Sequence, residues 1–234
     1  MTGLFRKTSP SPATCSIPPE QLILLHGLYR RKPCENLIQV EARFVGKAEI
    51  RASALKARRG LNPNEVRGKN AAIFAALQTF PLVVSAQTIL CYVSSKDNEV
   101  DTERLITWLL EMDRSVLVPI ALANRALEWS RLLSLEDLTR GRFDILEPRL
   151  DRRRIEVPPR DAVVIVPGVA FRPDGYRLGY GAGYFDRFLS NHRGPRIGLA
   201  FDVQVTESFQ PDPHDVPVDY VVTESRVFQR RPPE

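Results

Sequence analysis

The sequence lacks the features that mark several large classes of protein. Its 234 residues include only three cysteines, Cys15, Cys34 and Cys91, and no two of them stand in a C-x-x-C spacing. An odd count without that spacing argues against a disulfide framework and against a zinc site. The apolar runs are short, and none approaches the roughly 20 apolar residues of a membrane-spanning helix. We therefore expect a soluble, cytoplasmic protein without a membrane partner.

Excess positive charge is also absent from most of the chain. The formal net charge is +5, but residues 1–46 carry six Lys or Arg against three Glu and so account for +3 of it. The remainder is nearly neutral and shows no dense basic stripe interleaved with aromatic residues, so a nucleic-acid partner is not expected. Small anions such as nucleotides still fit the overall positive charge.

The first 46 residues differ in composition from the rest of the chain. Prolines interrupt them repeatedly, as in Ser-Pro-Ser-Pro at residues 9–12, and no helical or alternating period is sustained. We interpret them as a low-order basic extension. Their arginines and low acidity weakly resemble an organelle transit peptide, although the prolines disfavour the amphipathic helix that such peptides form. We predict a single α/β domain of residues 47–228 and a short tail of residues 229–234.

Two helices are predicted at the start of the domain. The first covers residues 47–59, where Lys47 and Arg51 lie one turn apart and share a face. The second begins at Asn62, because Asn62-Pro63-Asn-Glu65 places an N-cap residue, a proline at the first helical position and a glutamate in a capping-box position. Apolar residues then recur at helical spacing until Pro81 ends the run.

The following residues alternate between strand and helix patterns. A strand over residues 88–93, a helix over 101–112 capped by Asp101 and a strand over 116–120 describe a crossover unit with parallel strands. Residues 163–166 are continuously apolar, as in a strand buried on both faces. Further elements are predicted in four places: a hairpin-like region over 126–133, a helix over 184–190 and strands over 196–201 and 220–223. At most six strands are predicted, in a three-layer sandwich.

A glycine-rich segment carries the clearest chemical signal. Gly179, Gly181 and Gly183 alternate with other residues and would let backbone N–H groups converge on phosphate oxygens. A helix that begins near Gly183 would add its positive end, Arg177 could neutralise phosphate charge and Asp186 could hold a magnesium ion. The spacing is neither the Walker nor the dinucleotide fingerprint. From this spacing alone, a glycine-rich turn with packed tyrosines remains an equal alternative.

The longer string resembles the signature of one family. Pro167-Gly168-Val-Ala-Phe171, followed by Asp174-Gly-Tyr-Arg-Leu-Gly-Tyr-Gly-Ala-Gly-Tyr-Phe-Asp-Arg-Phe-Leu189, is similar to the signature of 5-formyltetrahydrofolate cyclo-ligases, also called 5,10-methenyltetrahydrofolate synthetases. The resemblance covers residues 47–224. Four further motifs recur in the order of the family: Lys47-x-x-x-Arg51, Glu99-Val-Asp101-Thr102, Gly141-Arg-Phe143 with Glu147-Pro148, and His214-Asp215-x-Pro217-Val218-Asp219.

The resemblance implies a fold and a reaction. The fold is a three-layer α/β/α sandwich with a mostly parallel central sheet, of the NagB/CoA-transferase-like kind. The reaction uses ATP as co-substrate and Mg²⁺ as cofactor to convert 5-formyltetrahydrofolate into 5,10-methenyltetrahydrofolate, with release of ADP and phosphate. Phosphorylation of the formyl oxygen would make that poor electrophile reactive toward the neighbouring N10. The protein is expected to act as a monomer with these small molecules as its partners.

The resemblance also assigns roles to residues of this chain. Arg177 and Asp186 would be catalytic, and Asp186 and Asp215 would bind the metal. The residues expected to bind ATP are Lys47, Arg51, Arg177, Leu178, Gly179, Tyr180, Gly181, Ala182, Gly183, Tyr184 and Phe185. Those expected to contact the folate are Arg51, Lys96, Asp101, Tyr180, Gly181, Ala182, Gly183 and Tyr184.

Several of these residues also have structural interpretations. Lys47 and Arg51 suit a solvated helix face, Asp101 suits a plain N-cap, and Asp215 suits the start of a turn before Pro217. The chain departs from the family pattern at Phe185, where a second tyrosine is frequent, and at Asp144, where a glycine is common; both departures could change the fit of the folate.

Two rival functions remain at this stage. One is a sugar-phosphate isomerase or acyl-transfer enzyme of similar architecture, in which a glycine loop binds phosphate without ATP or magnesium. Such an enzyme needs a base aimed at a carbon acid, and the sequence offers no candidate. The other is a non-catalytic folate-binding or RNA-associated module that uses the basic extension.

Overall fold

A seven-stranded sheet organises the computed structural model, which describes residues 46–141 and 144–231. The strand order is β11-β10-β9-β6-β1-β2-β3, in which the five central strands pair in parallel and the two edge strands pair antiparallel. The strands are β1 (Thr88–Cys91), β2 (Ser115–Ala121), β3 (Leu127–Leu132), β6 (Val163–Val166), β9 (Arg196–Leu199), β10 (Tyr220–Val222) and β11 (Val227–Gln229). The predicted α/β fold with a mostly parallel central sheet is confirmed.

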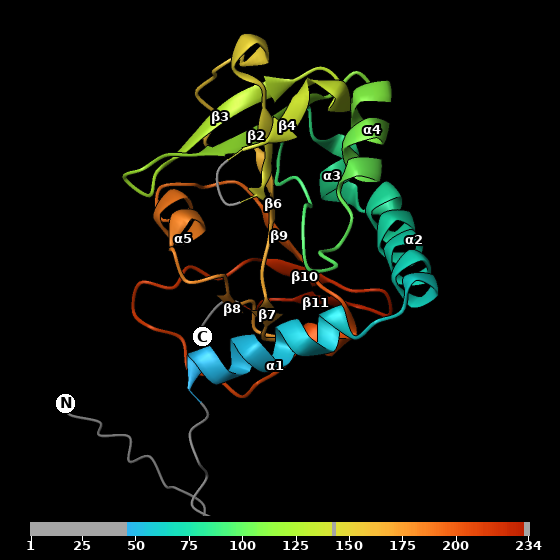
Figure 1. The fold of residues 1–234 in the computed structure, drawn as a ribbon, viewed down its shortest axis with the longest axis vertical. Helices are drawn as coiled ribbons and strands as arrows, with labels where there is room; N and C mark the ends of the chain where they lie inside the picture. The colour runs from blue at the N-terminus through green and yellow to red at the C-terminus, as the bar shows by residue number, and fades with distance from the viewer. Residues whose placement is uncertain (1–45, 142–143, 232–234) are drawn as a thin grey trace, which may run out of the picture. The chain divides into compact units, whose positions relative to one another are not determined.

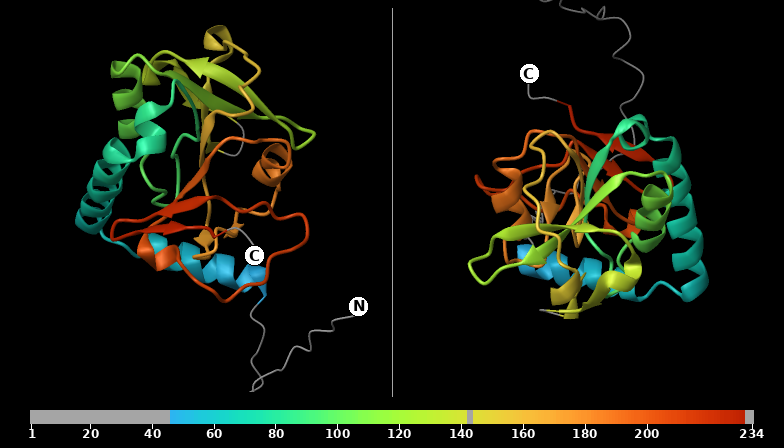
Figure 2. Two further views of the ribbon diagram at one scale, coloured as in Figure 1. Left: turned by 180° about the vertical axis from the view of Figure 1, so that it is seen from behind. Right: turned by 90° about the horizontal axis from the view of Figure 1, so that it is seen from above.

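Helices cover both faces of this sheet (Figures 1 and 2). Three of them, α2 (Pro63–Thr79), α3 (Pro81–Ser85) and α4 (Glu103–Glu111), pack on one face, and α5 (Tyr184–Leu189) packs on the other. The fifth helix, α1 (Lys47–Arg59), lies against a small hairpin instead. That hairpin is formed by β7 (Ala170–Phe171) and β8 (Arg177–Leu178), and a second hairpin is formed by β4 (Leu138–Arg140) and β5 (Leu146–Pro148).

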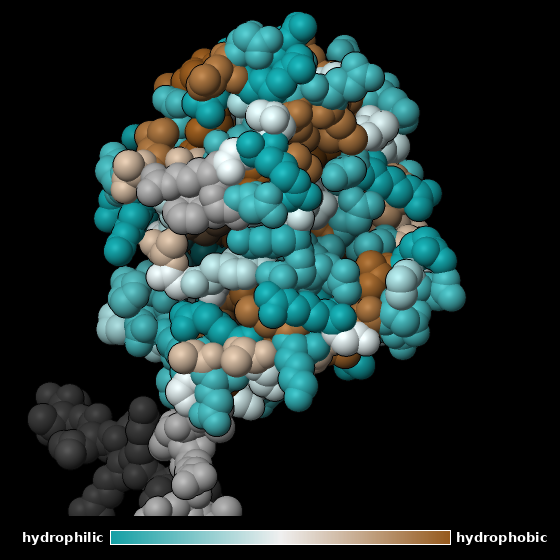
Figure 3. Space-filling view, in the orientation of Figure 1, coloured by the Kyte–Doolittle hydropathy of each residue, from teal (hydrophilic) through white to brown (hydrophobic). Residues whose placement is uncertain are grey.

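The central strands are buried on both faces because their side chains alternate between two apolar clusters. In β1, Ile89 and Cys91 join the cluster under α2, α3 and α4, whereas Leu90 joins the cluster under α5. A third cluster joins Ile50 and Ala54 of α1 to the β7–β8 hairpin. Polar side chains cover most of the face shown in Figure 3, and none of the described helices has the length and apolarity that a membrane span requires.

Local sequence signals place the helix boundaries well. The Asn62 side chain accepts hydrogen bonds from the N–H groups of Asn64 and Glu65, and the Glu65 carboxylate accepts one from Asn62 N–H, so the predicted capping box is confirmed. Pro81 ends α2 as predicted but also opens α3, because a proline is tolerated at the first helical position. The helix predicted from Asp101 begins at Glu103, whose N–H donates to the Asp101 carboxylate.

The described region differs from the predictions at its C-terminal end. The sheet has seven strands instead of six, because β11 pairs with β10. The predicted boundary between domain and tail at residue 228 falls inside β11 (Val227–Gln229). The expected extension lies outside the described residues except for Gly46, and so do Arg142 and Phe143 of the mid-chain motif.

Two glycine substitutions test the packing of the sheet. A Cβ atom on Gly198 in β9 would lie 2.4 Å from the ring of Phe171, which is fully buried, whereas one on Gly68 in α2 would meet no atom within 4 Å. Overpacking of this kind costs about 1–3 kcal/mol, so Gly198→Ala should lower the free energy of unfolding by that amount. Gly68→Ala should raise it by about 0.5–1 kcal/mol, because alanine favours the helix. Urea denaturation measures both, and a Gly198→Ala protein with wild-type stability would contradict the packing of Phe171.

Candidate functional site

The candidate site lies where the order of the parallel strands reverses. From β1 the chain continues through α4 to β2, and from β6 it continues through α5 to β9 on the opposite side. The loops that follow β1 and β6 therefore separate, and such a point at the carboxyl ends of parallel strands is a frequent ligand site. A cleft of about 440 Å³ opens here, lined by Tyr92 and Val93 after β1 and by Pro167 and Gly168 after β6. A second hollow of about 410 Å³ lies beside it and shares Ala121 and Glu147 with it.

The glycine-rich segment of residues 179–183 forms one wall of the cleft, here called the glycine wall. Gly181 and Gly183 have φ values of +102° and +74°, a conformation that glycine adopts without strain. A Cβ atom on Gly179, Gly181 or Gly183 would meet no other atom within 4 Å, so these glycines border open space and do not serve close packing. The N–H groups of Gly181, Ala182 and Gly183 donate no hydrogen bond to any described residue. The wall thus presents backbone donors to the cleft, as an anion-binding loop does.

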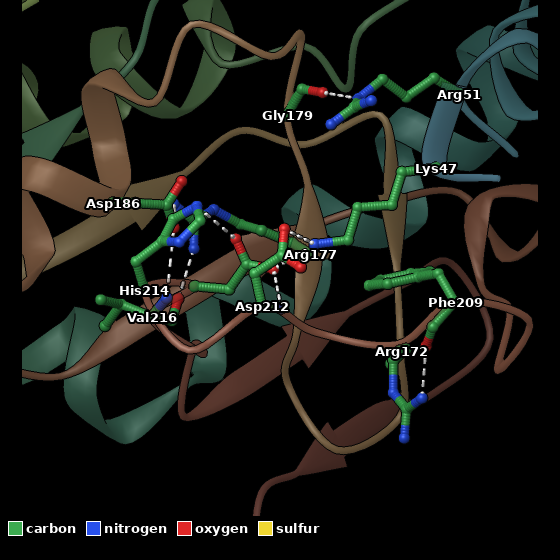
Figure 4. A network of polar contacts seen from close by, with 11 residues as sticks. Lys47, Arg51, Arg172, Arg177, Gly179, Asp186, Phe209, Asp212, His214 and Val216 are labelled. Atoms are coloured by element: carbon green, nitrogen blue, oxygen red, sulfur yellow. Dashed lines mark hydrogen bonds and ion pairs between the residues drawn. The ribbon is translucent and has the colours of Figure 1, made fainter. Parts of the chain in front are cut away.

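Lys47 faces two carboxylates at one end of the cleft (Figure 4). Its Nζ lies 2.6 Å from Oδ2 of Asp212 and 2.7 Å from Oδ2 of Asp215. Burial alone would raise the pKa of the Asp215 carboxyl, but the hydrogen bond from Lys47 and that from the Asp212 N–H hold this pKa below its ordinary value. Burial likewise opposes the charge of Lys47, yet its two hydrogen bonds raise the pKa of the ammonium. Both groups are therefore charged near neutral pH.

A buried arginine pairs with a partly exposed aspartate next to the glycine-rich segment. The side chain of Arg177 is only 3% exposed, and one of its guanidinium nitrogens lies 3.1 Å from Oδ1 of Asp186. Arg177 also donates to the carbonyl of Val216, while Val216 N–H donates to Asp186 Oδ1 at 3.2 Å (Figure 4). Burial lowers the pKa of the Arg177 guanidinium, and the charge of Asp186 opposes that shift. Arg177, which was predicted to bind ATP, lines the cleft, but its charge already has a partner in Asp186.

The donors around Asp215 suit a divalent cation. Asp212, His214 and Asp215 each offer a ligand atom, and these atoms lie within 4.8 Å of one another. Carboxylate oxygens are the ligands that Mg²⁺ prefers, and the position of Lys47 shows that two of them already face one positive group. Asp186 lines the same cleft and is joined to this segment through Val216. The predicted ligands Asp186 and Asp215 are thus neighbours, and Asp212 and His214 are additional candidates.

All but one of the residues predicted to contact the folate line the cleft. Arg51 donates from Nε to the Gly179 carbonyl at 2.8 Å, and the Lys96 ammonium lies 4.7 Å from the centroid of the Tyr180 ring. Both residues line the cleft, as do all the predicted residues of the glycine segment. Asp101 does not line it, because its carboxylate caps the start of α4. Glu99, two residues earlier in the same motif, lines the cleft instead.

Two buried charged residues near the cleft were not predicted as site residues. Glu147 is 5% exposed and accepts a hydrogen bond from the N–H of Ala121. The sequence feature that could have identified it is its place in the Glu147-Pro148 motif. Arg58 is 1% exposed and donates to three other segments. Its signal was its spacing of seven residues from Arg51, which places both on one face of α1.

The two departures from the family pattern have structural explanations. Phe185 is partly buried and packs against both main apolar clusters, so a hydroxyl is not needed there. Asp144 has φ +59°, the left-handed region that glycine favours and aspartate tolerates. It pairs with Arg140 on the surface and does not line the cleft, so the expected effect on folate fit has no support at this position.

The sequence is similar to those of one protein family. Residues 43–224 match the model of the 5-formyltetrahydrofolate cyclo-ligase family. A 5-formyltetrahydrofolate cyclo-ligase of Escherichia coli (strain K12) is 34% identical over 180 residues, which cover 74% of this chain and 97% of the relative. The mitochondrial 5-formyltetrahydrofolate cyclo-ligase of Arabidopsis thaliana is 28% identical over 224 residues, which cover 85% of this chain and 81% of the relative.

Solved structures lead to the same family. The NMR structure of Aquifex aeolicus 5,10-methenyltetrahydrofolate synthetase matches with a TM-score of 0.69 and 33% identity over 80% of this chain and 94% of that one. A 5,10-methenyltetrahydrofolate synthetase from Mycoplasma pneumoniae matches with a TM-score of 0.62 over 76% of this chain and 98% of that one, and at 22% identity it supports the fold alone. This chain belongs to the 5-formyltetrahydrofolate cyclo-ligase family, whose members are ligases.

Proposed function

We propose that the chain uses ATP and Mg²⁺ to close 5-formyltetrahydrofolate to 5,10-methenyltetrahydrofolate, with release of ADP and phosphate. The observation that carries this proposal is the glycine wall: three successive N–H groups without a partner among the described residues border a cleft at the carboxyl ends of β1 and β6. Such a wall suits a polyphosphate because it supplies several donors without a bulky side chain.

Cationic side chains complete the nucleotide side of the proposed site. Lys47 and Arg51 lie on one face of α1 and both line the cleft. Lys47 is bound to Asp212 and Asp215, so we expect it to exchange these carboxylates for phosphate oxygens when the nucleotide enters. Arg177 contributes by fixing Asp186 beneath the glycine wall, since its guanidinium is buried and paired there.

The metal of the proposal would be held by Asp186 and Asp215. Asp212 and His214 are close enough to Asp215 to contribute as well. A bound Mg²⁺ would neutralise the negative charge that accumulates on the phosphates. The residues of this chain orient the carboxylates: Arg177 and Val216 N–H fix Asp186, and Asp212 N–H fixes Asp215.

The proposed chemistry has two bond-forming steps. The formyl oxygen attacks the γ-phosphorus and ADP leaves, which makes the formyl carbon electrophilic. N10 of the folate then attacks that carbon, phosphate leaves with the former formyl oxygen, and the N10 proton passes to water. Positioning and charge neutralisation account for most of the catalysis in such transfers. Tyr180, Tyr184 and Lys96 line the cleft and would contact the folate. Glu99, which lines the cleft where Asp101 does not, would supply the acidic contact that was expected of Asp101.

A direct assay tests the proposal. The full-length protein is mixed with 5-formyltetrahydrofolate, ATP and magnesium, and the absorbance of methenyltetrahydrofolate is followed. We expect product only when all three are present, with no product after EDTA addition or omission of ATP. Formation of product without ATP would contradict the phosphorylation step, and absence of product in the complete mixture would contradict the function.

A substitution at Asp186 tests the metal assignment. Asp186→Asn keeps the size of the side chain but removes its charge, so turnover should fall about a hundredfold or more, as after loss of a group that stabilises developing charge. Asp174→Asn is the matched control, because Asp174 pairs with Arg172 on an exposed turn and does not line the cleft. The control should keep wild-type turnover. An Asp186→Asn protein with normal activity would refute the metal role of this residue.

A methyl group on the glycine wall tests the phosphate site. Gly179 does not have a positive φ, and its Cβ would project into open space, so Gly179→Ala should leave the free energy of unfolding unchanged. If the nucleotide occupies that space, the KM for ATP should rise about tenfold, equivalent to about 1.4 kcal/mol. Gly68→Ala, on the exposed side of α2, serves as control for the KM measurement. An unchanged KM for ATP would place the nucleotide elsewhere.

A further inference from the structure

Arg58 does not line the cleft, but it connects three segments that surround the cleft. It lies near the C-terminal end of α1, which runs beneath β7 and β8 in Figure 1. Its Nε donates to the Asp97 carbonyl at 2.6 Å, and its two terminal nitrogens donate to the Gly168 carbonyl at 3.3 Å and to the Tyr180 hydroxyl at 2.8 Å. One side chain thus joins the loop after β1, the loop after β6 and the glycine wall.

The burial of this guanidinium requires an explanation. Arg58 is 1% exposed, and removing such a charge from water is costly unless its hydrogen bonds are satisfied. Its three acceptors among the described residues are neutral oxygens, and no carboxylate of the described chain pairs with it directly. Tyr180 connects the positive charge of Arg58 to negative charges, because its hydroxyl oxygen lies 3.3 Å from a carboxylate oxygen of Asp97 and 3.3 Å from one of Glu99. The Tyr180 hydroxyl is therefore the link between a buried cation and two acidic side chains.

This link determines where the Tyr180 ring lies. Tyr180 is 45% exposed and lines the cleft, so few packing contacts restrain its ring. The hydroxyl is its fixed end, and Lys96 lies over the ring face at 4.7 Å. Without the Arg58 donor, the hydroxyl would lose its shortest hydrogen bond, and the ring would lose the anchor that holds it against the cleft.

The neighbouring arginine shows that this arrangement is specific to Arg58. Within the part of the chain that the structure describes, Arg59 bonds only to the Asp97 carboxylate, and its side chain is 58% exposed. An exposed pair of this kind contributes little to stability or positioning. Arg59 therefore provides a matched control one residue away, with the same side chain and one shared partner residue.

We propose that Arg58 is a positioning residue that fixes Tyr180 and the loop of residues 95–99 for folate binding, and that it acts through the Tyr180 hydroxyl. The proposal rests on the proposed function, because it takes Tyr180 and Glu99 as the folate side of the cleft. It adds a residue that no cleft contact would reveal. A side chain that is mobile in the free protein loses conformational freedom when a ligand binds it, and this loss lowers the affinity. A buried partner that fixes the side chain beforehand removes this cost and so raises the affinity.

The test is a double-mutant cycle on the full-length protein. Binding of 5-formyltetrahydrofolate is measured by titration calorimetry for wild type, Arg58→Met, Tyr180→Phe, the double variant and Arg59→Met. We expect each single change at Arg58 or Tyr180 to raise the Kd for the folate about tenfold, and the double variant to match Arg58→Met, because the two residues act as one unit. Arg59→Met should bind the folate as wild type does.

A purely structural role would give a different pattern. In that case Arg58→Met would lose stability while its folded fraction bound folate normally, or its effect would add to that of Tyr180→Phe, and either result would overturn the proposal. If Arg58→Met fails to fold, Arg58→Lys keeps the charge but lacks the planar fork that reaches three oxygens, and its Kd should still be raised. Wild-type binding by Arg58→Lys or by Tyr180→Phe would overturn the proposal.

The binding readout separates this proposal from the proposed function. A wild-type protein that binds 5-formyltetrahydrofolate but forms no methenyl product would contradict the function, and the cycle would still decide the role of Arg58. A wild-type protein that does not bind this folate would overturn the Arg58 proposal. Loss of turnover without any change in Kd among the variants would overturn it as well.

Discussion

The reversal of strand order between β1 and β6 is the constraint on which the site depends. Because β1 leads to one side of the sheet and β6 to the other, the loops that follow them must separate at the carboxyl ends of the strands. The buried apolar strands hold this opening rigidly, since their side chains fill clusters on both faces. The glycine wall is connected to β6 by the β7–β8 hairpin, so the sheet determines where the N–H groups of the wall lie.

Two groups of charges in the cleft are already paired. Lys47 is bound to Asp212 and Asp215, and Arg177 is bound to Asp186. Breaking either set would leave partly buried carboxylates without a cation, which is costly. On the proposed function, a nucleotide and its metal would therefore complement each other: Lys47 would exchange the carboxylates for phosphate oxygens, and Asp212 and Asp215 would then be available to a cation. Such an exchange would favour entry of ATP together with Mg²⁺ over entry of either one alone.

The sequence predicts best those features that depend on neighbouring residues. The capping box at Asn62, the buried strand Val163–Val166 and the open glycine segment are local patterns, and each was found where it was expected. The edge strand β11 was missed because three residues carry too little pattern without their pairing partner. Asp101, which was predicted to contact the folate, caps α4, whereas Glu99 of the same motif lines the cleft; only the fold decides which of the two carboxylates caps the helix.

The position of Arg58 depends both on the helical period of α1 and on the packing of α1 against the rest of the protein. An α-helix turns by about 100° per residue, so residues 47, 51 and 58 fall on one face of α1 while residue 59 turns away. That period places three cations on one face, but it does not say that the last becomes buried while the first two line a cleft. The difference arises because α1 packs on the β7–β8 hairpin and brings its C-terminal end under Tyr180. A helix that does not pack on the main sheet thereby supplies both residues that line the cleft and a buried support for Tyr180.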